Sequence, residues 1–147
     1  MRTKLFALLL ALPLLASSAA FAQTATSPLG RWKTFDDETG KPMSITEVYE
    51  AKNGKLAAKV VETLNTPNAM CTKCSGDKKN KPVIGMPVLW NLEKTADGWG
   101  NGQGFKPSTG DSFKAKSVKL IDGGNKLEIT GCKLALFCRT AHWARVD

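Results

Sequence analysis

The chain has 147 residues, a formal net charge of +8, four cysteines and a single histidine. Its length fits one domain, and 42% hydrophobic with 23% charged residues is typical of a globular protein rather than a disordered one. With one histidine, His142, the sequence excludes a histidine-pair metal site and most acid–base catalytic arrangements.

The N-terminal segment has the three successive regions of a secretory signal peptide. Arg2 and Lys4 precede an apolar run over 5–15, and small residues then lead to Ala20-Phe21-Ala22. We therefore expect a signal peptide at 1–22, cleaved at an A-x-A site, and one mature domain at 23–147. The alternative is a membrane anchor, but an eleven-residue helix is about 16 Å long, about half of a bilayer core. Since no later stretch is apolar enough to span a membrane, the sequence predicts an exported protein, periplasmic or secreted.

The mature part shows the alternating pattern of β-strands, and no window has the 3.6-residue apolar period of a helix. Turn signals such as Asn53-Gly54 and Asp97-Gly98 separate the alternating segments. A long connection over 64–82 interrupts the series. The predicted strands cover 29–35, 43–51, 55–63, 83–93, 99–106, 113–121, 126–132 and 137–146.

Eight strands joined mostly by short turns favour an all-β, eight-stranded, up-and-down antiparallel barrel. Closure removes the exposed edges of a flat sheet, and the interior is either filled or holds one small ligand. Gly100, Gly102 and Gly104 alternate on one strand, which allows a close approach or sharp coiling of the sheet. A two-sheet sandwich is the alternative.

The two ends of this domain resemble the lipocalin and calycin signature. Gly30-Arg31-Trp32 opens the first predicted strand and Trp143-Ala144-Arg145 closes the last one. In a barrel of even strand number these ends are neighbours, so the ring of Trp32 would plug one end beneath a guanidinium. Arg145 is the expected partner, and Arg139 is the alternative.

A longer resemblance covers nearly the whole mature chain. The chain is similar to a family of small exported bacterial proteins, known only as a domain of unknown function, with a lipocalin-like barrel. The resemblance implies this fold and export, and it implies no established reaction. Lys106-Pro107 and Phe113 stand where family members often carry Asp-Pro and a tyrosine. The matching segments are 30–32, 36–42, 71–74, 81–86, 139–140 and 143–145.

The four cysteines form two short motifs. We expect Cys71 and Cys74 to form a local disulfide, because no helix follows them as a redox Cys-x-x-Cys pair requires. Cys132 and Cys138 flank a five-residue connection and can bridge a hairpin. Pairing between the motifs, a redox role for the first motif and a zinc site remain alternatives, but the spacings and export favour two disulfides, no metal and no cofactor.

The predicted function is non-catalytic binding of a small, partly apolar ligand, with an anionic group as an option. Candidate lining residues are the aromatic side chains of Trp90, Trp99, Tyr49 and Phe113. The basic segment over 73–81 would attract anions, whereas an exported chain is not expected to bind nucleic acid. The alternatives are an interaction module of the cell envelope and a thiol oxidoreductase.

Overall fold

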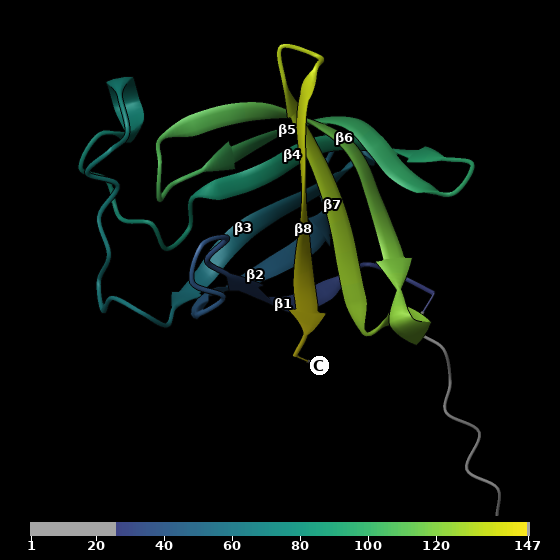
Figure 1. Ribbon diagram of the computed structural model, residues 1–147, viewed down its shortest axis with the longest axis horizontal. Helices are drawn as coiled ribbons and strands as arrows, with labels where there is room; N and C mark the ends of the chain where they lie inside the picture. Colours follow the sequence, from purple (N-terminus) through teal and green to yellow (C-terminus); the bar gives the residue numbers. More distant parts are fainter. Residues whose placement is uncertain (1–25, 147) are drawn as a thin grey trace, which may run out of the picture.

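The computed structural model describes residues 26–146, and the predicted signal peptide at 1–22 lies outside this range. Within it the chain forms eight strands and two single-turn 3-10 helices (Figure 1). These elements are β1 (Gly30–Phe35), β2 (Pro42–Glu50), β3 (Leu56–Thr63), η1 (Gly76–Lys78), β4 (Pro87–Thr95), β5 (Gly98–Lys106), β6 (Asp111–Ile121), η2 (Asp122–Gly124), β7 (Lys126–Lys133) and β8 (Phe137–Arg145).

Each strand pairs antiparallel with the next one in sequence, and β8 returns to β1 to close the barrel. The predicted all-β, eight-stranded, up-and-down barrel is therefore confirmed, and the sandwich alternative is wrong. The closing pair is short, because only Trp32 with Arg145 and Lys33 with Ala144 lie opposite each other. The rest of β8 pairs with β7 alone. None of the described residues forms a helix that is long and apolar enough to cross a membrane.

The predicted start of β4 is wrong by four residues. The apolar stretch Val83–Met86 is not part of the strand, because its backbone hydrogen bonds do not follow a strand ladder. The N–H of Val83 donates to the carbonyl of Ala69 at 2.9 Å, and the N–H of Gly85 donates to the carbonyl of Val60 at 2.7 Å. The strand begins at Pro87, which has no N–H to contribute to a ladder. The long connection thus extends over 64–86.

The end of the barrel that holds the start of β1 is closed. Trp32 is 0% exposed, and its indole N–H donates to the carbonyl of Pro28 at 2.8 Å. The guanidinium of Arg145 lies 4.2 Å from the centre of the Trp32 ring, a cation–π contact. Arg145 also donates to the carbonyls of Gly124, Leu29 and Ser27 at 2.8, 3.2 and 2.7 Å. The predicted plug is confirmed, with Arg145 rather than Arg139 over the ring.

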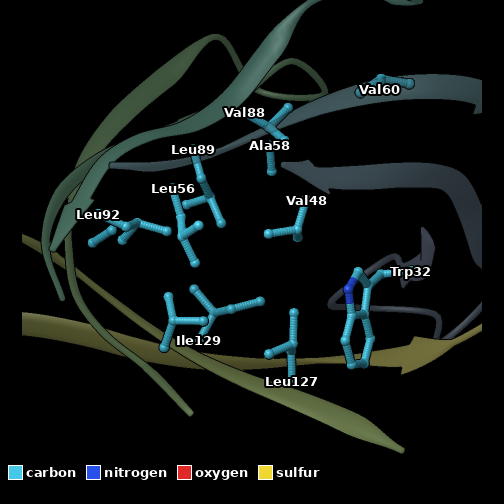
Figure 2. Packing of buried hydrophobic residues seen from close by; sticks show 12 residues of the cluster. Trp32, Val48, Leu56, Ala58, Val60, Val88, Leu89, Leu92, Leu127 and Ile129 are labelled. Carbon is cyan, nitrogen blue, oxygen red and sulfur yellow. The ribbon is translucent and has the colours of Figure 1, made fainter. Parts of the chain in front are cut away.

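The main core lies inside the barrel next to this plug. Trp32, Val48, Leu56, Leu127 and Ile129 point toward one another from β1, β2, β3 and β7 (Figure 2). A second, smaller cluster lies between the 64–86 connection and β5 and consists of Cys71, Cys74, Met86 and Phe105. We call the end opposite the plug the rim; it carries the connections at 36–41, 64–86, 107–110 and 134–136.

Candidate functional site

A row of hydroxyl groups lines the inner wall of β1 and β2. Residues that lie opposite each other on paired strands project from the same face, and Thr46 lies opposite two core residues, Trp32 and Val60. Thr46 is 1% exposed, and its Oγ1 has no hydrogen-bond partner among residues 26–146. Leaving a buried hydroxyl unsatisfied costs about 1–3 kcal/mol. The hydroxyl of Thr46 therefore does not contribute to the stability of the fold.

The same row continues toward the rim. Thr34 and Ser44 lie opposite each other, each two residues from Trp32 or Thr46, so they share the inner face. Their hydroxyl oxygens are 2.7 Å apart, and both side chains are half-buried. The inner wall of β1 and β2 is therefore polar from the level of the plug up to the rim.

The wall across the barrel is apolar. Phe113 on β6 packs against the main core, and its ring lies over Gly104 on β5 and Gly131 on β7. A Cβ at either glycine would overlap this ring, so glycine is needed for the approach. Gly102 similarly makes room for the side chain of Leu92. The glycine row predicted from sequence therefore serves close approaches, made by side chains and backbone carbonyls of the protein itself.

Arg139 places a cation on the inner wall near the rim. It alternates on β8 with Ala141 and Trp143, which lie opposite the core residues Ile129 and Leu127, so Arg139 belongs to the inward-facing set. It is nevertheless exposed, which shows that solvent reaches the inner wall of β8 near the rim. Among the described residues, its guanidinium has no ion pair or hydrogen bond.

Two carboxylates at the rim have lysine partners. Asp111 pairs with Lys133 at 2.9 Å, and Asp37 pairs with Lys106. The hydrogen bond from Lys133 holds the pKa of Asp111 below its usual value, with a further contribution from Thr109. Asp37 and Asp111 thus have cationic partners of their own, and neither these acids nor the exposed Glu38 and Asp77 form an ion pair with Arg139.

A hollow of about 540 Å³ lies at the same end, and Phe113 is among the residues that line it. Gln103 and Lys114 line it, and both face outward because their neighbours Gly104 and Phe113 face the interior. The base of the β7–β8 hairpin completes the wall with Lys133 and Leu134. The hollow therefore lies between the hairpin and the rim ends of β5 and β6.

The four aromatic residues predicted to line a ligand site do not come together. Phe113 lies on the inner wall as described. Trp99 packs against the main core beside the 96–97 turn, at the plug end, with Lys94 Nζ 3.9 Å from its ring centre. Trp90 packs against the second cluster, and Tyr49 lies next to the inward-facing Val48 with Lys59 over its ring. Their roles in binding stay predictions.

The cysteines pair within their motifs. The structure joins Cys71 to Cys74 and Cys132 to Cys138, which are the predicted pairs, and leaves no free cysteine among residues 26–146. Cys71 and Cys74 are buried, whereas Cys138 is exposed. In the same part of the chain, no group of three or more His, Cys, Asp or Glu side chains is arranged to hold a metal ion.

Sequence reasoning missed Thr34, Ser44 and Thr46 and assigned Arg139 only as a rival partner for Trp32. One signal could have found the hydroxyls. If Trp32 is the inward plug, the residues that face it across the 36–41 turn must also point inward. The segment Ser44-Ile45-Thr46 offers hydroxyls at alternate positions, but the strand register decides which face they occupy.

An eight-stranded antiparallel barrel, plugged at one end by a tryptophan beneath an arginine, defines a lipocalin-like barrel. A solved Helicobacter pylori protein, HP1028, described as belonging to the lipocalin family, has the same fold, with a TM-score of 0.69 and 20% identity over 84% of this chain and 85% of that one. Residues 30–145 match the family described as "uncharacterized protein conserved in bacteria (DUF2147)", and the chain belongs to this family. No curated protein is significantly similar to it in sequence.

Proposed function

We propose that this protein is an exported, non-catalytic binding protein that takes a small apolar carboxylate into the rim end of its barrel. The observation that carries the proposal is Arg139, an uncompensated guanidinium in the inward-facing set of β8. A guanidinium binds a carboxylate through two parallel hydrogen bonds, and this geometry gives both affinity and orientation. Binding in the mouth of a β-barrel also fits the fold, although a fold alone does not determine function.

The two walls supply complementary surfaces for such a ligand. Phe113 offers an apolar face to the body of the molecule. The hydroxyls of Thr34 and Ser44 offer donors and acceptors on the other side, because β1–β2 and β5–β6 lie across the closed barrel from each other. Thr46, one step deeper, has a hydroxyl that still lacks a partner. A ligand with one polar end and an apolar body matches this distribution.

The disulfides and the position of the histidine support the rest of the proposal. Two disulfides suit an oxidising compartment, in agreement with the predicted signal peptide. Cys71 and Cys74 are buried beside Met86 and Phe105, and thiol–disulfide exchange requires an accessible sulfur. His142 lies beside Glu128 on the outer face at 3.2 Å, away from the inner wall. These placements favour binding over redox or acid–base chemistry.

The decisive experiment is a titration with a fluorescent long-chain fatty acid, carried out on disulfide-intact protein. We expect saturable binding to the native chain and about tenfold weaker binding to Arg139→Gln, because the charge-assisted pair is lost. The matched control is Lys116→Gln, which removes an exposed cation from β6 and should leave the affinity unchanged. The corresponding fatty alcohol should not distinguish the native protein from Arg139→Gln. Equal fatty-acid affinity of both proteins, or no binding to the native chain, would refute the proposal.

Thr46→Val provides a second test that separates binding from folding. The substitution keeps the shape of the side chain and removes the unsatisfied hydroxyl, so the folded protein should be as stable as before or more stable. If the hydroxyl contacts the ligand, the affinity for the fluorescent fatty acid falls while the melting temperature does not. A variant that binds as tightly as the native chain would remove Thr46 from the site.

A further inference from the structure

The tip of the β7–β8 hairpin exposes a group of large apolar side chains. Leu134 is 86% exposed, Leu136 is 85% exposed and Phe137 is 69% exposed. In Figure 1 this hairpin projects beyond the other strands at the rim end. Single exposed apolar residues need no explanation, but three together at the tip of one projecting hairpin indicate an interaction site.

The tip holds these side chains in a strained and fixed conformation. Leu134 and Ala135 have φ angles of 50° and 60°, in the left-handed region that costs about 1–2 kcal/mol for a residue with a Cβ. The N–H of Leu136 donates to the carbonyl of Leu134 at 2.7 Å. The disulfide between Cys132 and Cys138 joins the two strands directly below the tip. Strain that is held in this way points to a functional role for the conformation.

Cations flank the apolar tip. Lys133 precedes it and Arg139 follows it, while Lys114 lies across the adjacent hollow. The carboxylate that faces this group is Asp111, and it is paired with Lys133. An apolar tip between basic residues is typical of proteins that insert into the interface of an anionic membrane. A two-fold contact between two copies would instead bring the cations of both tips together.

The 64–86 connection at the same end repeats this composition. Met70 and Ile84 are about half exposed, and the exposed lysines of the connection are Lys73, Lys78, Lys79 and Lys81. It adjoins the 107–110 turn, since Cys71 Sγ contacts the carbonyl of Pro107 at 3.4 Å. The rim thus combines exposed apolar and basic side chains on two separate segments, and its exposed acids are Asp37, Glu38 and Asp77.

We propose that the rim docks on an anionic phospholipid membrane. Leu134, Leu136 and Phe137 enter the interfacial region, and the basic side chains of the rim contact the headgroups. The barrel end that holds Arg139 then faces the lipid. The apolar side chains that enter the membrane belong to the tip and not to the ligand site, so this docking can be tested separately from the proposed ligand, although Arg139 serves in both.

Vesicle flotation tests the proposal with disulfide-intact protein. We expect the native chain to float with vesicles of phosphatidylcholine and phosphatidylglycerol, and much less with phosphatidylcholine alone. Leu134→Ser/Leu136→Ser should weaken partitioning at least about tenfold without loss of stability, because both side chains are almost fully exposed. About 0.5 M salt should weaken partitioning as well, since it screens the headgroup attraction. The control is Val146→Ser, which removes an exposed apolar side chain at the plug end and should change nothing.

Three results would overturn the inference. The first is partitioning that does not depend on phosphatidylglycerol, and the second is full partitioning of the double serine variant. The third is a native dimer without vesicle binding that the same variant converts to monomer in sedimentation, because the tip would then join two copies. The double serine variant should keep its fatty-acid affinity in vesicle-free solution, so failure of the docking and failure of the proposed function are separate results.

Discussion

Gly104 leaves the space that the ring of Phe113 occupies. A Cβ at this position would overlap the ring, and the ring cannot move away because it also lies against Gly131. We therefore expect Gly104→Ala to lower the free energy of unfolding by about 1–3 kcal/mol, as overpacking does in other cores. Urea denaturation measures the effect. Adding Phe113→Leu to the same chain should restore part of the loss, whereas native stability of Gly104→Ala would show that the ring has room to shift.

Arg145 stabilises the plug through geometry as well as charge. Its guanidinium reaches three backbone carbonyls from Gly124, Leu29 and Ser27 while it lies over Trp32. A lysine carries the same charge but cannot hold a planar fork against three acceptors. Arg145→Lys should therefore cost about 1–3 kcal/mol, measured by thermal or urea unfolding.

The exposed Arg139 is the matched control for that substitution. Arg139→Lys removes no hydrogen bond that the described residues form, so its effect on stability should stay within about 0.5 kcal/mol. If Arg145→Lys and Arg139→Lys lower the free energy of unfolding equally, the hydrogen bonds of Arg145 to the carbonyls at the plug add no stability beyond that of its charge.

At the scale of the element, the β7–β8 hairpin depends on its disulfide. Cys132 and Cys138 are six residues apart and lie opposite each other on the two strands. A bridge over so short a loop stabilises the chain by about 2 kcal/mol in the chain-entropy model. We expect Cys132→Ala/Cys138→Ala to lower the free energy of unfolding by about this amount, measured in urea without reductant. An unchanged midpoint would mean that the strained tip offsets the entropic gain.

The strands themselves were largely predictable. Alternation and turn residues such as Asn53-Gly54 predicted the strands other than β4 to within two residues at each end. The start of β4 was predicted wrongly because the apolar stretch Val83–Met86 has the composition of a strand. Its backbone bonds instead to Ala69 of the long connection and to Val60 of β3. A contact so distant in sequence leaves no local signal.

At the scale of the molecule, the candidate site was much less predictable than the fold. On β2 the sequence offers two faces, and at the rim end of the strand the face with Met43 and Ile45, of which Ile45 is also buried, would be the natural choice for the interior. The register across the 36–41 turn instead places Ser44 and Thr46 inside. A shift of one residue would reverse the two faces, and the register includes an irregularity between Thr34 and Phe35. Arg139 likewise reaches the inner wall only through the register of the β7–β8 hairpin.

The ion pairs of the whole barrel predict how its stability depends on pH. Glu93 pairs with Lys55 at 2.8 Å, Asp97 with Lys119 at 2.6 Å and Asp111 with Lys133 at 2.9 Å. The hydrogen bond from each lysine is the main cause that lowers the pKa of its carboxyl partner below the usual 4.5 for Glu93 and 3.8 for the two aspartates. A carboxyl with a lowered folded pKa stabilises the protein above its unfolded pKa, and that contribution is lost as the pH falls through the folded pKa.

Stability should therefore decrease below about pH 4, and protonation of the acids adds to the positive charge of a chain that is already at +8. The pKa of Lys119 is raised from 10.5 by its hydrogen bond to Asp97, so that pair also weakens at strongly alkaline pH. The measurement is the melting temperature between about pH 7 and pH 2 for the native chain and for Asp97→Asn/Asp111→Asn. The double variant should melt lower than the native chain at neutral pH, and the difference should close in acid. A constant difference over the whole range would show that these pairs do not carry the acid sensitivity.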